Sequence, residues 1–139
     1  MRIDKDNLGL LDTDLVCIHD DVYEGIQYDY NTNCVFLYLS TACERHRKKI
    51  VFHNVIGFQM IACDLWGASP HIIGWEYNLE EKHSLLARIS KECDECHREH
   101  TILSRKLEHG IAYIETQFLL SSGDRFVVVC EYIDYCVDK

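Results

Sequence analysis

The segment with the strongest chemical signature is Cys93-Asp94-Glu95-Cys96-His97-Arg98-Glu99-His100. Two thiols three residues apart, followed by two imidazoles, can converge on one metal ion from one side of a helix. Zinc accepts such a set, because thiolate sulfur and imidazole nitrogen both fit its tetrahedral shell. The sequence therefore offers four metal ligands, which are Cys93, Cys96, His97 and His100.

Three other interpretations apply to the same segment. Its first five residues match the Cys-x-x-Cys-His pattern of c-type haem attachment, but no export signal precedes them. A thioredoxin-like redox pair belongs at a helix N-terminus after a strand, whereas Cys93 and Cys96 fall mid-helix. A structural zinc site commonly uses a second Cys-x-x-Cys pair, which this chain lacks. We therefore favour packing of both cysteines in a core over zinc, and expect no cofactor.

A second chemical possibility is a pocket near Trp66 and Trp75, to which Asp64, His71 and Glu76 could contribute. This arrangement would suit a small-molecule-binding protein or a small enzyme. No dinucleotide, phosphate-loop, metalloprotease or nucleophile-elbow motif occurs in the chain. The sequence thus favours a non-enzymatic protein with no catalytic residue.

Composition and charge are those of one acidic domain that spans residues 1–139. The chain is 47% hydrophobic and 11% aromatic, so it can bury a core of its own. Fourteen Lys and Arg against 23 Asp and Glu give a net charge of 14 − 23 = −9. This charge disfavours nucleic acid and suits a basic protein partner. No apolar run is long enough for a signal peptide or a membrane helix, so we expect a cytoplasmic protein with no membrane partner. A reducing compartment would keep the eight cysteines as thiols.

Alternating apolar residues predict strands on both sides of one helical stretch. Asn31-Thr32-Asn33 and Ser121-Ser122-Gly123-Asp124 are turn sequences between apolar runs, which predicts two β-hairpins. Residues 41–49 read as a polar loop that holds the basic run Arg45 to Lys49. The expected strands are Val22–Tyr30, Cys34–Leu39, Ile50–Ala62, His71–Leu79, Ile111–Leu120 and Arg125–Val137.

Helical periodicity extends over residues 80–109, which contain neither Gly nor Pro. An apolar seam runs along it with spacings of three and four, through Leu86, Ile89, Cys93, Cys96, His100, Leu103 and Leu107. A helix of about 28 residues would be about 42 Å long, which exceeds a compact domain of this size. It must break, project, or pair with a second copy through the 86–107 seam to form a homodimer. The resulting fold class is α+β, a mostly antiparallel sheet of about six to seven strands with one long helix (about 80–109) packed on it.

The order of strands and turns resembles that of a family of small bacterial β-rich domains. The segments that carry the resemblance are Ile50-Val51-Phe52-His53-Asn54-Val55, Asp64-Leu65-Trp66-Gly67 and Ser122-Gly123-Asp124-Arg125-Phe126. Some members are assigned as immunity proteins of toxin systems. The resemblance implies a cytoplasmic, non-enzymatic domain that binds and blocks a protein toxin. It implies no functional residue.

Overall fold

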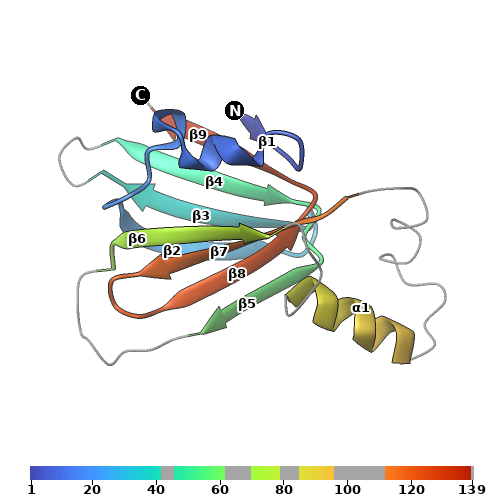
Figure 1. Cartoon of the computed structure of the whole chain (residues 1–139). Coiled ribbons are helices and arrows are strands. Elements are labelled where there is room, and N and C mark those ends of the chain that lie inside the picture. The colour runs from blue at the N-terminus through green and yellow to red at the C-terminus, as the bar shows by residue number, and fades with distance from the viewer. Residues whose placement is uncertain (42–45, 62–69, 79–84, 96–111, 139) are drawn as a thin grey trace.

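The protein is built from two antiparallel sheets, shown in the computed structural model of Figure 1. The structure describes residues 1–41, 46–61, 70–78, 85–95 and 112–138. The first sheet has the order β1 (Arg2–Ile3), β9 (Tyr132–Asp138), β4 (Arg47–His53), β3 (Cys34–Ser40), β2 (Val22–Asp29). The second has the order β5 (Gly57–Ile61), β8 (Arg125–Cys130), β7 (Ile114–Leu120), β6 (Ile72–Asn78). Two 3₁₀ helices, η1 (Leu8–Asp12) and η2 (Asp14–Val16), lie between β1 and β2 in the chain, and α1 (Leu85–Glu95) follows β6.

Both predicted hairpins are confirmed. Strands β2 and β3 pair from Asp29↔Cys34 onward, and β7 and β8 pair around the second turn. Asn33 has a φ of 54° and Gly123 a φ of 88°, left-handed values that Asn and Gly tolerate better than other residues. Local turn chemistry is therefore sufficient to specify these two units.

The predicted single sheet is wrong, because two expected strands change sheets halfway. Residues 50–62 divide at Asn54, whose φ is 53°, into β4 in the first sheet and β5 in the second. Residues 125–137 divide at Glu131 into β8 and β9, again in different sheets. Two backbone hydrogen bonds join the chain segments at these two crossings. Glu131 N–H donates to the His53 carbonyl at 3.0 Å, and Ile56 N–H donates to the Val129 carbonyl at 2.9 Å. Alternation of apolar residues continues through such a crossing, so the pattern does not reveal it.

The hydrophobic core lies between the two sheets. Phe118 of β7 stacks on Phe126 of β8 at 4.9 Å and meets Phe52 of β4 edge-to-face at 6.0 Å, which joins the sheets through aromatic contacts. Residues of the N-terminal segment complete the core beside the sheets: Leu8, Leu11, Val16 and Ile18. In Figure 1 this segment (blue) crosses in front of the first sheet, beside β6.

The predicted long helix is also wrong. Within the described residues the α-helix covers Leu85–Glu95, 11 residues, and residues 96–109 lie outside them. Leu86 and Ile89, the first residues of the expected dimer seam, pack against Val129 on the outer face of the second sheet. Strand β8 is therefore covered on both faces and lies between β5 and β7, the position that suits a strand with apolar residues on both faces. Nowhere in the described residues is a helix long and apolar enough to cross a membrane.

The prediction that the basic run lies in a loop is wrong for its last three residues. Arg47, Lys48 and Lys49 belong to β4. Lys48 alternates with Ile50 and Phe52, so its side chain points to the buried side of the sheet, where only 7% of the residue is exposed.

Candidate functional site

The predicted metal ligands are not assembled in the part of the structure that is described. Cys93 is a residue of α1, whereas Cys96, His97 and His100 lie outside the described residues. Among the described residues, no group of three or more His, Cys, Asp or Glu side chains could hold a metal ion. The described residues therefore give no support to the zinc hypothesis.

Only part of the predicted pocket near Trp66 and Trp75 falls within the described residues. Trp66 lies outside the described residues, and Trp75 lines a hollow of about 340 Å³ on the outer face of the second sheet. The other lining residues are Gly74, Glu76, Gln117, Leu119 and Arg125. A second hollow, of about 510 Å³, lies on the same face between α1 and the sheet. His71 does not line either hollow.

A different site emerges where the N-terminal segment meets β6. The carboxylate of Asp12 accepts a hydrogen bond from Nε1–H of Trp75 at 3.1 Å and another from the Tyr77 hydroxyl at 2.6 Å. The hydrogen bond to Asp12 raises the pKa of the Tyr77 hydroxyl above its ordinary value of 10.0. One acidic side chain thus fixes two neighbouring aromatic side chains at the surface.

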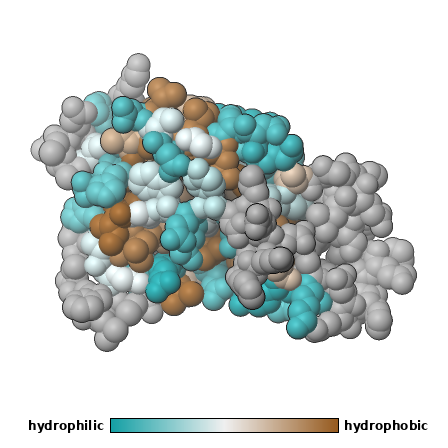
Figure 2. Space-filling view, in the orientation of Figure 1, coloured by the Kyte–Doolittle hydropathy of each residue, from teal (hydrophilic) through white to brown (hydrophobic). Residues whose placement is uncertain are grey.

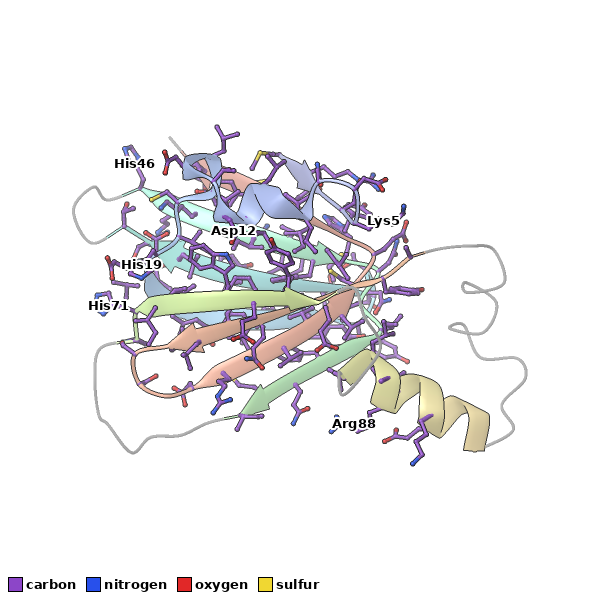
Figure 3. All side chains as sticks on the ribbon, in the orientation of Figure 1. Lys5, Asp12, His19, His46, His71 and Arg88 are labelled. Atoms are coloured by element: carbon purple, nitrogen blue, oxygen red, sulfur yellow. The ribbon has the colours of Figure 1, made fainter. Side chains whose placement is uncertain are left out.

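The same surface continues toward the beginning of β6. The ring of His19 meets Trp75 edge-to-face at 6.5 Å, and Nδ1 of His19 lies 3.0 Å from a carboxylate oxygen of Asp20. Figure 3 shows Asp12 between the N-terminal segment and β6, with His19 and His71 at the end where β6 begins. We call the set Asp12, His19, Asp20, Trp75 and Tyr77 the acidic aromatic surface.

Buried Lys48 holds the turn that carries His19 and Asp20. Its Nζ lies 2.7 Å from Oδ2 and 3.0 Å from Oδ1 of Asp21, and it also donates to the carbonyl of Cys17. The Lys48 ammonium group therefore binds residues at both ends of the Cys17–Asp21 turn. Burial raises the pKa of the Asp21 carboxyl above its ordinary 3.8, although the bond to Lys48 opposes the shift.

Backbone hydrogen bonds join this turn directly to β6. Asp20 N–H donates to the Ile72 carbonyl at 2.8 Å, and Ile72 N–H donates to the Asp21 carbonyl at 2.9 Å. Asp20 adopts a φ of 66°, in the left-handed region that Asp tolerates. The turn and the strand consequently present their side chains as one unit.

The surroundings of this site combine negative charge with exposed apolar groups. Residues 7–21 and 71–78 contain five carboxylates and no Lys or Arg. Asp21 is paired with Lys48, and Glu76 lines the hollow on the outer face of the second sheet, which leaves the carboxylates of Asp12, Asp14 and Asp20. Leu15 is 65% exposed and Ile73 is 44% exposed. Figure 2 shows such hydrophobic (brown) side chains among hydrophilic (teal) ones on the face seen there.

Sequence analysis named Trp75 but missed the residues that position it. Asp12 and Trp75 are 63 positions apart, so no spacing rule connects them. Lys48 could have been found, because its alternation with Ile50 and Phe52 continues the strand pattern. The comparisons add no further assignment: no family model and no curated protein matches the chain.

Proposed function

We propose that the protein is a non-enzymatic, cytoplasmic interaction domain that binds a basic protein partner through the acidic aromatic surface. The observation that carries the proposal is the pair of hydrogen bonds from Trp75 and Tyr77 to Asp12. A toxin blocked by an immunity-type protein is the partner class that the strand pattern implies.

Trp and Tyr are the residue types that most often dominate binding energy at protein interfaces. They bring a large apolar area together with a polar group, and few rotatable bonds need to be ordered on binding. Here Asp12 already fixes both side chains in the free protein, so less conformational entropy is lost when a partner binds.

Charge supports a basic partner in particular. The net charge is −9, and the carboxylates of Asp12, Asp14 and Asp20 lie on or beside this surface, in segments without Lys or Arg. Such a surface attracts a basic protein over a distance and repels nucleic acid. The attraction weakens as salt screens it, over a length of about 8 Å at physiological ionic strength.

Site-specific crosslinking in the cells from which the chain derives tests this proposal. A photoreactive amino acid replaces Ile73, which is exposed beside the site, and in a matched control replaces Tyr30, which is 84% exposed in the β2–β3 turn. We expect one basic protein to be linked at position 73 and not at position 30. Equal linkage at both positions, or linkage of an acidic protein only, would contradict the proposal.

The linked protein is then purified and its affinity measured. We expect Trp75→Ala to raise Kd about tenfold or more, as at interface hot spots. Asp12→Asn should raise Kd less, because it keeps the shape but weakens the charge. Raising the salt from about 50 mM to about 0.5 M should weaken binding to the unchanged protein, and this salt effect should shrink in Asp12→Asn. Binding that is independent of salt would remove the argument from charge.

A further inference from the structure

Cys34, His53 and Asp134 meet on the outer face of the first sheet, away from the acidic aromatic surface. Cys34 of β3 pairs with His53 of β4, and Asp134 lies on β9, the other neighbour of β4. Sγ of Cys34 lies 3.5 Å from Nδ1 of His53, and Nε2 of His53 lies 3.1 Å from a carboxylate oxygen of Asp134. A thiol, an imidazole and a carboxylate thus stand in line across three strands.

The carboxylate decides which histidine nitrogen faces the thiol as a base. Ionised Asp134 only accepts hydrogen bonds, so Nε2 of His53 carries the hydrogen between them. In the neutral ring Nδ1 then has a free electron pair, directed at the sulfur of Cys34. When Nδ1 takes up a proton, Asp134 stabilises the imidazolium. This is the arrangement of a nucleophile, its base and the group that orients the base.

Aromatic stacking holds the imidazole in place. The His53 ring stacks on Tyr132 with centroids 4.5 Å apart and planes 12° apart. The guanidinium of Arg2 lies 3.8 Å from the centroid of the Tyr132 ring. The Cys34 thiol also contacts the Thr32 carbonyl at 3.4 Å, so its single hydrogen can point to either acceptor.

Exposure limits the size of what can react. Cys34 is 6% exposed, whereas the side chains of His53 and Asp134 are 25% and 36% exposed. Solvent therefore reaches the base more freely than the sulfur. A peptide or an ester could not approach a thiol so enclosed, but a peroxide molecule, which is little larger than water, could.

We propose that Cys34 is a nucleophilic thiol that reacts with hydrogen peroxide, with His53 as its base and Asp134 as the residue that positions the base. Nδ1 of His53 accepts the thiol proton, and the sulfur attacks one peroxide oxygen. An S–O bond forms and the O–O bond breaks, and the departing hydroxide takes the proton from His53 to leave as water. The sulfur is oxidised to a sulfenic acid while the peroxide is reduced, so thiol plus peroxide gives sulfenic acid plus water.

The product persists long enough to be trapped. Cys136, the other described thiol on this face, pairs with Lys49, four residues along β4 from His53. Four residues of a strand span about 13 Å, too far for a disulfide with Cys34. The sulfenic acid therefore has no thiol partner on this face among the described residues.

The test treats the reduced, folded, full-length protein with hydrogen peroxide at neutral pH for set times and then removes the peroxide with catalase. The protein is next unfolded in urea that contains dimedone, a sulfenic-acid trap, so that the trap reaches a sulfur that is enclosed in the folded state. Mass spectrometry of the peptides measures the labelling rate at each cysteine. We expect Cys34 to be labelled about tenfold faster than the exposed Cys136, because a positioned base accelerates proton transfer. Cys130, which is fully buried, should stay unlabelled and so reports that the fold is intact.

Two variants separate the base from the fold. His53→Gln and Asp134→Asn should each lower the Cys34 rate about tenfold and leave the Cys136 rate unchanged. The ratio of the two rates within one sample cancels differences in reagent, and labelling of Cys130 identifies a variant that has unfolded. If Cys34 reacts no faster than Cys136, or if the ratio survives in whichever variant keeps Cys130 protected, the proposal is overturned.

Discussion

Nζ of Lys48 lies 2.7 Å from a carboxylate oxygen of Asp21, and both side chains are more than nine-tenths buried. Lys48 belongs to β4, at the centre of the first sheet, and Asp21 belongs to the turn that directly precedes β2. The pair connects the interior of the protein to the surface, because the same turn carries His19 and Asp20 and is hydrogen-bonded to β6. Stability and the proposed binding site therefore depend on the same contact.

Breaking this pair should destabilise the protein strongly. Lys48→Met leaves the Asp21 carboxylate without its cation, and the loss of one partner of a buried pair typically costs about 3–5 kcal/mol. The free energy of unfolding in urea measures the effect. Lys49→Met is the control, since Lys49 lies on the outer face over the Phe36 ring and should matter by about 1 kcal/mol or less.

The partners of the pair should also be coupled. Lys48→Met combined with Asp21→Asn should cost less than the sum of the single changes by about 1–3 kcal/mol. Additive effects would mean that the two side chains do not stabilise each other.

The Asp21 carboxyl should make stability fall as the pH rises through its titration. Burial raises its pKa above 3.8 in the folded state, so the folded protein binds this proton more tightly than the unfolded chain does. The stabilisation is present below pH 3.8 and is lost as the pH rises through the raised pKa. Carbon-13 NMR of the carboxyl gives the pKa directly, and unfolding measured against Asp21→Asn gives the linked change. If the stability of the unchanged protein rose with pH relative to that of Asp21→Asn, the predicted direction would be contradicted.

The contact between Gly57 and Ile89 should control how α1 packs on the sheet. A Cβ at Gly57 would lie 2.5 Å from Cδ1 of Ile89, so Gly57→Ala forces that side chain to move. Overpacking typically costs about 1–3 kcal/mol, and the cost here should lie at the lower end, because the displaced atom is the end of a partly buried side chain. Thermal unfolding followed by circular dichroism measures the loss.

Two further variants define the cause. Ile89→Val removes the offending methyl group and should recover part of the stability of Gly57→Ala. Gly25→Ala is the control, because nothing lies within 4 Å of its added Cβ. If Gly57→Ala behaves like Gly25→Ala, the helix does not pack as described.

Removing the Asp12 carboxylate should release Tyr77. In Asp12→Ala the pKa of the Tyr77 hydroxyl should fall back toward 10.0, because the hydrogen bond to Asp12 is what raises it. Ultraviolet titration of this variant, compared with Asp12→Ala/Tyr77→Phe, isolates the signal of that tyrosine. Stability should change little, since a hydrogen bond at an exposed site contributes little net energy. An unchanged Tyr77 titration would show that Asp12 does not hold this ring in solution.

Local patterns predicted the two hairpins, but not the number of sheets. The turn residues Asn33 and Gly123 act within a few positions, so their effect is visible in the sequence. The breaks at Asn54 and Glu131 change the partner of a strand without interrupting its apolar alternation. The heptad pattern likewise showed that Leu86 and Ile89 form an apolar face, but not that a sheet would cover it.

Only part of the acidic aromatic surface could be recognised in the sequence. Trp75 was recognisable as a residue able to line a site, whereas its partners Asp12 and His19 come from a segment about sixty positions away. The Cys34–His53–Asp134 cluster spans one hundred positions and carries no motif, since each member lies within an ordinary strand. Neither assembly has a spacing that a motif search could use.

By itself the sequence determined the residue types, the net charge of −9, the two hairpin turns and the faces along which apolar side chains alternate. These properties follow from short-range sterics and from the period of a strand. The tertiary structure alone decided which strands share a sheet, that Lys48 meets Asp21, and that Asp12 meets Trp75. The reason is physical: such contacts form only when burial of the common core brings distant segments together, and that burial is a property of the whole chain.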